Sequence, residues 1–168
     1  MIKNKLSSLI SIDPGSNKIG IACFKQEHLI ESEQVNLKGT TFYNRLRAMK
    51  LAVATFLAKY SNIGYIAIET PYFGRNPQTG LKLGMARGII LSLAFRHKIK
   101  IIDISPQEVR SHYGVRGNAK KEEYQKIVKL EFAKEINKKL GEDEADAIAI
   151  GSTAITKIRQ AILYNKTK

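Results

Sequence analysis

The chain has 168 residues, about the size of one domain, and its 28 Lys and Arg against 15 Asp and Glu give a formal net charge of +13. This charge favours nucleic acid as the partner, and the lack of any run of about 18 apolar residues argues against a membrane span. The start of the sequence has no signal-peptide pattern, and the single cysteine, Cys23, cannot form an internal disulfide. We therefore expect one domain over residues 1–168, with Cys23 in its core, in the cytoplasm of a bacterial or virus-infected cell.

Residues 9–24, LISIDPGSNKIGIACF, predict two paired strands with an acid between them. Leu9, Ile10 and Ile12 form a run too apolar for a sheet edge, so the first strand should be covered on both faces. Asp13 ends this strand just before a Pro-Gly break, and a turn then leads into the second strand. Because Asp also favours turns through local hydrogen bonds alone, its role depends on where the other acids fall.

A third strand, a helix and a fourth strand follow. Residues 29–37 alternate between apolar and polar types, which predicts a half-exposed antiparallel strand. Thr40 or Thr41 can cap the next segment, an amphipathic helix of about five turns. Residues 63–69 form a short apolar run of strand length that ends in Glu69, so this strand also ends in an acid.

The segment from residue 71 to 100 contains six Lys or Arg and no Asp or Glu. A stretch of this composition needs an anionic partner to explain it. Its first part is predicted to be a loop that exposes Tyr72 and Phe73 just after Glu69. These rings could stack on unpaired bases, or they could pack into the core.

The second part of this segment, residues 80–97, is predicted to be a helix. Its apolar residues are Leu81, Met85, Ile89 and Phe95. Gly84, Ala86 and Gly88 leave one helix face nearly bare, which allows another element to approach closely. We expect this face to pack tightly on the sheet or to form a dimer contact.

Residues 99–104 predict a fifth strand, and Ser105-Pro106 opens a short helix through Val109. After it, residues 110–118 form a basic loop that contains glycine. This order completes a pattern of three strands, then a helix, a strand, a helix and a strand, with helices at the end.

Residues 119–140 predict a long charged helix. Its apolar stripe consists of Tyr124, Ile127, Val128, Phe132 and Ile136. A solvated helix face explains most of its lysines. Lys120 and Lys121 are different, because cations in the first turn oppose the helix dipole and imply some other partner.

The last helix begins with Glu142-Asp143-Glu144-Ala145-Asp146. Acids in a first turn favour a helix on dipole grounds alone. Asp143 and Asp146 are three residues apart, however, and small apolar residues follow them, so we expect them on one buried face. Two buried carboxylates repel each other unless a cation neutralises them. The apolar side of this helix contains Ile148, Ile155, Ile158 and Ile162.

Three motifs occur in order along the chain: SIDPGSNKIGIA, AIETPYFGRN followed by LKLGMARG, and EDEADAIAIG. With them the sequence resembles the RuvC type of Holliday-junction resolvase, within the ribonuclease H-like superfamily, over residues 9–154. The resemblance implies an α/β, ribonuclease H-like fold. Its five-stranded mixed sheet would have three antiparallel strands followed by two parallel ones, flanked by helices.

The resemblance also implies which residues form the site. The catalytic, metal-binding acids would be Asp13, Glu69, Asp143 and Asp146. Tyr72 or Phe73 would be the aromatic residue that enters the junction, and the two adjacent aromatics are a departure from the family pattern. Arg110 is another departure, since it stands where the family often has lysine. The basic residues expected to contact DNA are Arg75, Lys82, Arg110, Arg116, Lys120 and Lys121.

The chemistry itself calls for acids. Phosphodiester hydrolysis needs an activated water and a stabilised leaving oxygen, which two divalent ions about 3.5 to 4 Å apart provide. Carboxylate oxygens suit Mg²⁺, with Mn²⁺ able to substitute, so we expect two such ions per active site. The three histidines lack metal-ligand spacing and are expected at the surface or in loops, with His112 as a candidate phosphate contact. They are His28, His97 and His112.

These inferences predict a metal-dependent endodeoxyribonuclease that resolves four-way DNA junctions by paired nicks. Because a four-way junction has two-fold symmetry, we expect a homodimer. Two alternatives are a broader branched-DNA or flap nuclease and a non-catalytic, junction-binding architectural protein. The second does not explain four acids in a basic protein. A kinase or ATPase of the actin-like fold would need a second, Gly-rich phosphate loop and a much longer chain. The sequence identifies no helicase partner.

Overall fold

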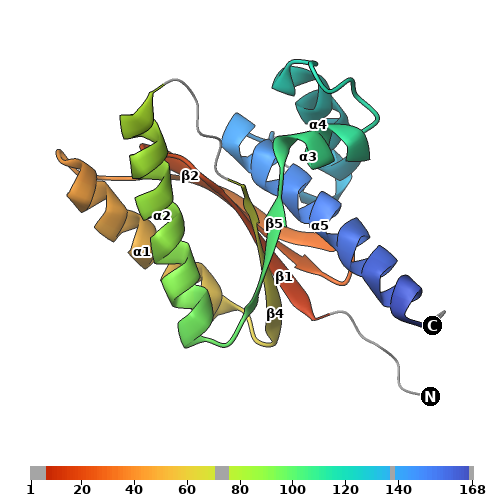
Figure 1. Cartoon of the computed structure of the whole chain (residues 1–168), viewed down its shortest axis with the longest axis horizontal. Helices are drawn as coiled ribbons and strands as arrows, with labels where there is room; N and C mark the ends of the chain where they lie inside the picture. Colours follow the sequence, from red (N-terminus) through yellow and green to blue (C-terminus); the bar gives the residue numbers. More distant parts are fainter. Residues whose placement is uncertain (1–6, 71–75, 137–138, 167–168) are drawn as a thin grey trace.

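The computed structural model describes residues 7–70, 76–136 and 139–166. These residues form a five-stranded sheet with helices on both faces (Figure 1). The elements in chain order are β1 (Ser8–Pro14), β2 (Lys18–Lys25), β3 (His28–Asn36), α1 (Phe42–Lys59), β4 (Ile63–Glu69), α2 (Pro77–Arg96), β5 (Lys100–Ile104), α3 (Pro106–His112), α4 (Lys121–Ile136) and α5 (Glu142–Lys166). Over this described part of the chain, every helix is too short or too polar to cross a membrane.

The strand order across the sheet is β3-β2-β1-β4-β5. The first three strands pair antiparallel, and β4 and β5 continue the sheet parallel to β1. The predicted mixed sheet of three antiparallel and two parallel strands is therefore confirmed. The central strand β1 is covered on both faces, as its apolar run indicated: Leu9, Ile10 and Ile12 have no exposed surface.

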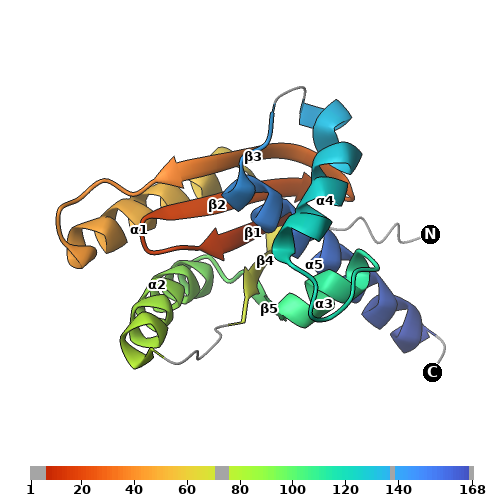
Figure 2. The same cartoon turned by 90° about the horizontal axis from the view of Figure 1, so that it is seen from above.

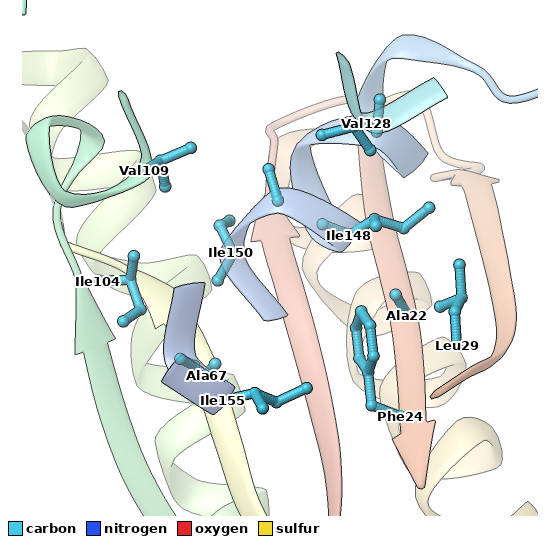
Figure 3. Close-up of a cluster of buried hydrophobic side chains, with 14 of the residues drawn as sticks. Ala22, Phe24, Leu29, Ala67, Ile104, Val109, Val128, Ile148, Ile150 and Ile155 are labelled. Atoms are coloured by element: carbon cyan, nitrogen blue, oxygen red, sulfur yellow. The ribbon is translucent and has the colours of Figure 1, made fainter. Parts of the chain in front are cut away.

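Each face of the sheet has its own hydrophobic cluster. Helices α1 and α2 lie on one face (Figure 2). The cluster beneath them includes Ile10, Met49 and Ile90. On the other face α4 and α5 cover a second cluster, in which Phe24 and Ile148 lie together (Figure 3). Complete burial of a side chain of this size contributes about 1.5–3 kcal/mol relative to leaving it exposed. The two clusters together hold β1 in a fixed position between them.

Two glycines let α5 lie directly against the sheet. A Cβ atom on Gly151 would lie 2.6 Å from Ser11 Oγ, closer than real Cβ contacts occur. A Cβ atom on Gly20 would lie 2.5 Å from the carbonyl carbon of Asp143 in the first turn of α5. Gly20 is the register partner of Asp13 on β1. The first turn of α5 can therefore approach the end of β1 only because position 20 has no side chain.

Helix α2 has an exposed apolar face in addition to the face that packs on the sheet. Leu81 and Phe95 are 62% and 68% exposed, while the helix buries a different set of residues. That set is Gly80, Ala86, Ile90, Leu93 and Ala94. Because α2 has apolar residues nearly all round, their spacing alone could not select the buried face.

The three small residues of α2 do not share a face, so that expectation was wrong. Ala86 is buried against the sheet, whereas no atom of the described chain lies within 4 Å of a Cβ built on Gly84 or Gly88. Residues two apart on a helix point in nearly opposite directions, since each residue turns the helix by about 100°. Ala86 therefore serves the sheet contact, and the two glycines lie on the outer face.

Two boundaries also differ. Helix α3 continues to His112, so residues 110–112 belong to a helix and not to the predicted loop. Helix α4 spans 121–136 and its buried residues include Gln125, while Ile127 is 39% exposed. The side chain of Ile136 lies outside the described residues. The predicted stripe was wrong at Ile127 because a buried hydrogen-bonded glutamine takes its place.

Candidate active site

A cleft of about 630 Å³ lies where β1 and β4 end. Because these neighbouring strands are parallel, with Ile12 beside Ile68, their carboxyl ends bring Asp13 and Glu69 to the same edge of the sheet. Asp146 of α5 lines the same cleft. Three of the four acids predicted from the sequence therefore lie together, and they come from segments far apart in the chain.

The three carboxylates repel one another in this cleft. Burial, together with the charges of Asp146 and then Glu69, raises the pKa of Asp13 from 3.8 to about 8. Burial and the charge of Asp146 also raise the pKa of Glu69. Lys121 opposes both shifts, and Arg110 opposes that of Glu69. Three acids and two basic side chains line the cleft. A bound cation would relieve the repulsion that raises these pKa values.

Asp146 is bonded at both of its oxygen atoms. The Lys121 ammonium group donates to Oδ2 at 2.7 Å, while the Tyr124 hydroxyl and the Gln125 amide donate to Oδ1 at 2.9 and 2.7 Å. Within the described chain, Lys121 therefore has Asp146 as its partner. A buried carboxylate without such partners would be strongly destabilising.

Asp143 has a different position from the other acids. It is half-buried one turn before Asp146 and does not line the cleft, although its charge contributes to the raised pKa of Asp13. As the side chains stand, no three Asp, Glu, His or Cys residues in the described part of the chain are grouped closely enough to hold one ion. Asp146 is engaged by Lys121, so a cation would have to replace that partner.

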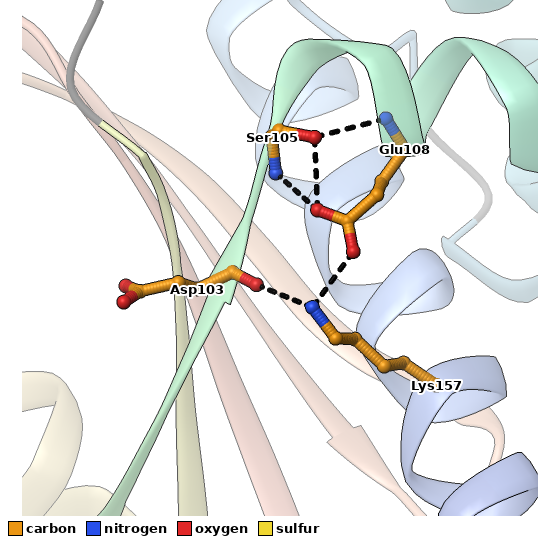
Figure 4. A network of polar contacts seen from close by, with 4 residues as sticks. All are labelled: Asp103, Ser105, Glu108 and Lys157. Carbon is orange, nitrogen blue, oxygen red and sulfur yellow. Dashed lines mark hydrogen bonds and ion pairs between the residues drawn. The ribbon is translucent and has the colours of Figure 1, made fainter.

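Arg110 of α3 also lines the cleft. Its Nε donates to the Ala119 carbonyl oxygen at 3.1 Å. The helix that carries it is tied down at its first turn, where Ser105 and Glu108 form a capping box. The Lys157 ammonium group of α5 donates to Glu108 Oε1 at 2.7 Å and to the Asp103 carbonyl oxygen at 3.0 Å (Figure 4). These contacts fix α3, and with it Arg110, against β5 and α5.

Comparison with known proteins identifies the family. A family model described as crossover junction endodeoxyribonuclease RuvC matches residues 9–156. The chain belongs to the RuvC family. The RuvC of Stenotrophomonas maltophilia is 29% identical over 154 residues, which cover 88% of this chain and 87% of that relative. The resemblance seen in the three sequence motifs is thus confirmed.

Solved RuvC structures share the fold. The Thermus thermophilus RuvC structure has a TM-score of 0.77 at 23% identity, covering 92% of this chain and 96% of that one. The same RuvC in complex with a Holliday junction substrate has a TM-score of 0.75 at 22% identity, covering 90% and 96%. The ribonuclease H-like fold predicted for the chain is therefore confirmed.

The remaining residues expected to contact DNA in this RuvC-family chain are spread over the molecule. Arg116 and Lys120 are exposed between α3 and α4. Lys82 is exposed on α2, with its Nζ 5.7 Å from the centre of the Phe42 ring, and it does not line the cleft. Three further expected contacts lie outside the described residues. They are Tyr72, Phe73 and Arg75.

The histidines divide into two groups. His28 and His97 are exposed, as expected. His112 is half-buried on α3, its Nε2 lies 2.9 Å from Ser152 Oγ, and it does not line the acidic cleft. The expectation of a loop position was wrong for His112, which is the last residue of α3 and is partly exposed where α3 packs against α5.

Sequence reasoning missed two residues of the site. Tyr124 was assigned to an apolar stripe and Gln125 was not considered. Both follow Lys121 by one helical turn, at spacings of three and four residues, which place them on the same helix face. This spacing, applied to the lysine that needed a partner, would have found them.

Proposed function

We propose that this RuvC-family chain is a single-domain, metal-dependent endonuclease that resolves Holliday junctions by paired nicks. The observation that carries the proposal is an acid-lined cleft in a protein with a net charge of +13. A protein that only binds DNA gains nothing from Asp13, Glu69 and Asp146 facing one cleft, because carboxylates repel phosphate. Since DNA is the substrate, the cytoplasm of a bacterial or virus-infected cell is the expected compartment.

The donor set suits magnesium. Asp13, Glu69 and Asp146 would hold the metal, with Asp143 supplying a fourth carboxylate from the preceding turn of α5. Carboxylate oxygens are the ligands that Mg²⁺ and Mn²⁺ prefer, and the mutual repulsion of these acids is relieved by divalent charge. We propose two Mg²⁺ ions per site, with Mn²⁺ able to substitute. When bound, such ions activate a water and stabilise the leaving oxygen.

Basic side chains at the cleft would hold the scissile strand. Arg110 and Lys121 flank the acids and can neutralise a phosphate there, while Lys120, Arg116, Lys82 and Arg75 can contact the duplex arms. Tyr72 or Phe73 would stack on a base that is unpaired at the crossover. We favour Tyr72, three residues after Glu69, because this spacing matches the aromatic residue of the family.

A homodimer would present two such sites to the two-fold symmetric junction. Its contact surface would be the outer face of α2, where exposed apolar side chains flank open glycine positions. These residues are Leu81, Gly84, Met85, Gly88 and Phe95. An exposed apolar patch of this kind on a soluble helix is typical of a protein contact. The Thermus thermophilus RuvC, which has the same fold, has been solved in complex with a Holliday junction substrate.

The decisive experiment compares substrates and acids together. The protein is incubated in Mg²⁺ with labelled four-way junctions, three-way junctions, flaps and linear duplex, alongside Asp13→Asn and Asp146→Asn. We expect paired nicks in the four-way junction from the wild type, no cleavage from either variant, and junction binding retained or strengthened in both. Equal cutting of flaps and junctions would favour the broader nuclease, and binding without any cutting would favour an architectural protein. Nicking by either variant would refute the assignment of the acids.

A further inference from the structure

One oxygen atom of Asp146 is held by two neutral donors from α4. The Tyr124 hydroxyl donates to Oδ1 at 2.9 Å, and the Gln125 amide donates to the same atom at 2.7 Å. All three side chains are buried, with Tyr124 8%, Gln125 3% and Asp146 5% exposed. Turning the carboxylate away would leave both buried donors without this acceptor, and buried polar groups are nearly always hydrogen-bonded. The orientation of this carboxylate is therefore fixed.

The two donors are fixed in turn. The Tyr124 ring stacks on Tyr113, with ring centres 6.3 Å apart and planes inclined by 22°. The Gln125 amide also lies 3.4 Å from the Glu142 carbonyl oxygen at the start of α5. These hydrogen bonds join one turn of α4 to the first turn of α5, and Asp146 lies where the two helices meet.

The second oxygen atom, Oδ2, has a different kind of partner. Lys121 donates to it at 2.7 Å from a side chain that is 50% exposed. An ammonium group on a flexible, half-exposed stem exchanges for another cation more readily than two buried neutral donors do. Asp146 therefore has one locked oxygen and one exchangeable oxygen.

We propose that Tyr124 and Gln125 are positioning residues that make Asp146 bind a divalent cation through Oδ2 alone. Neither residue needs to touch the metal, since both act through the carboxylate. The inference rests on the proposed metal-dependent function and adds two residues to it. Loss of an outer partner of a metal-binding side chain typically lowers metal affinity or activity by about 10–100-fold.

The test measures Mn²⁺ binding directly, by electron paramagnetic resonance of free Mn²⁺ in a titration of the whole protein without DNA. The variants are Tyr124→Phe and Gln125→Met, each of which removes one donor and keeps the shape of the side chain. Tyr113→Phe is the matched control, because it removes a buried hydroxyl that does not donate to Asp146 and keeps the ring that stacks on Tyr124. Thermal unfolding in EDTA shows that each variant is folded.

We expect Tyr124→Phe and Gln125→Met each to weaken Mn²⁺ binding by tenfold or more, with Tyr113→Phe unchanged. Junction affinity in EDTA should stay within twofold of the wild type, and cleavage by the variants should recover when Mn²⁺ is raised by the same factor. Recovery by metal separates positioning from general loosening of the fold. Wild-type Mn²⁺ affinity in both variants, or lost cleavage that saturating Mn²⁺ does not restore, would overturn the inference. A wild-type protein that binds no Mn²⁺ would instead overturn the metal proposal itself.

Discussion

Replacing Gly20 by Ala should lower the cleavage rate, although glycine has no side chain that could take part in catalysis. The added Cβ would lie 2.5 Å from the Asp143 carbonyl carbon and 3.2 Å from Ala147 Cβ, whereas carbon atoms pack at about 3.5–4.0 Å. The first turn of α5 must therefore move by about 1 Å. Forcing a methyl group into a packed contact costs about 1–3 kcal/mol, which for a chain of this size lowers Tm by about 2–12 °C.

The movement should affect catalysis more than stability. Asp146 is carried on the displaced turn, and a misplacement of about 1 Å can cost roughly 100-fold in rate. The assay is single-turnover cleavage of a four-way junction, with junction affinity measured in EDTA and Tm measured by circular dichroism. We expect a rate loss near 100-fold with junction affinity nearly unchanged.

Gly117→Ala is the matched control. No atom of the described chain lies within 4 Å of a Cβ built there, and its backbone has no left-handed conformation. It should cleave at the wild-type rate. The reasoning is refuted if Gly20→Ala also cleaves at that rate, or if both glycine variants lose activity equally.

Three further predictions follow from other parts of the molecule. In EDTA, the contribution of Asp13 to stability should fall as pH rises from about 4 to about 8, because its raised pKa lets the folded state keep a proton that the unfolded chain releases. Urea denaturation should therefore show the wild type losing stability relative to Asp13→Asn over this range, and parallel profiles would contradict this. Met85→Asp on the outer face of α2 should give monomers in sedimentation velocity, whereas Leu130→Asp, which changes a 79% exposed residue of α4, should stay dimeric. Identical behaviour of the two variants would argue against the α2 contact. Tyr72→Ala or Phe73→Ala should slow junction cutting about tenfold, which corresponds to about 1.4 kcal/mol, with duplex affinity unchanged; full cutting by both variants would place the rings in the core.

The sequence was most informative where local pattern and topology agree. The apolar runs that end in Asp13 and Glu69 indicated two buried strands, and parallel pairing of such strands brings their ends together. The small apolar residues after Asp146 indicated that this acid lies on a buried helix face. Lys121 could be marked as needing a partner, since a cation at a helix start is unfavourable.

The sequence could not predict which residues are buried by contacts between distant segments. Gln125 is buried because Asp146 and Glu142 accept its hydrogen bonds. A pattern of apolar residues cannot predict a polar side chain that is buried with its hydrogen bonds made. The buried face of α2 was ambiguous because apolar residues surround it. His112 is half-buried because Ser152, 40 residues away, provides its partner. Each of these depends on which helices meet across the sheet.

The separation of the two hydrophobic clusters by the sheet has a consequence for how this protein can change. The helix proposed to join two copies, α2, lies over one face of β1, while the helices that bear Lys121 and Asp146 lie over the other face (Figure 2). Substitutions at distant sites without shared partners act additively. The proposed contact on the outer face of α2 can therefore change while Asp146 keeps its partners on α4. Arg87 is the exception, because it extends from α2 and donates to the Glu69 carbonyl oxygen at 3.0 Å, so this residue links α2 to the proposed site.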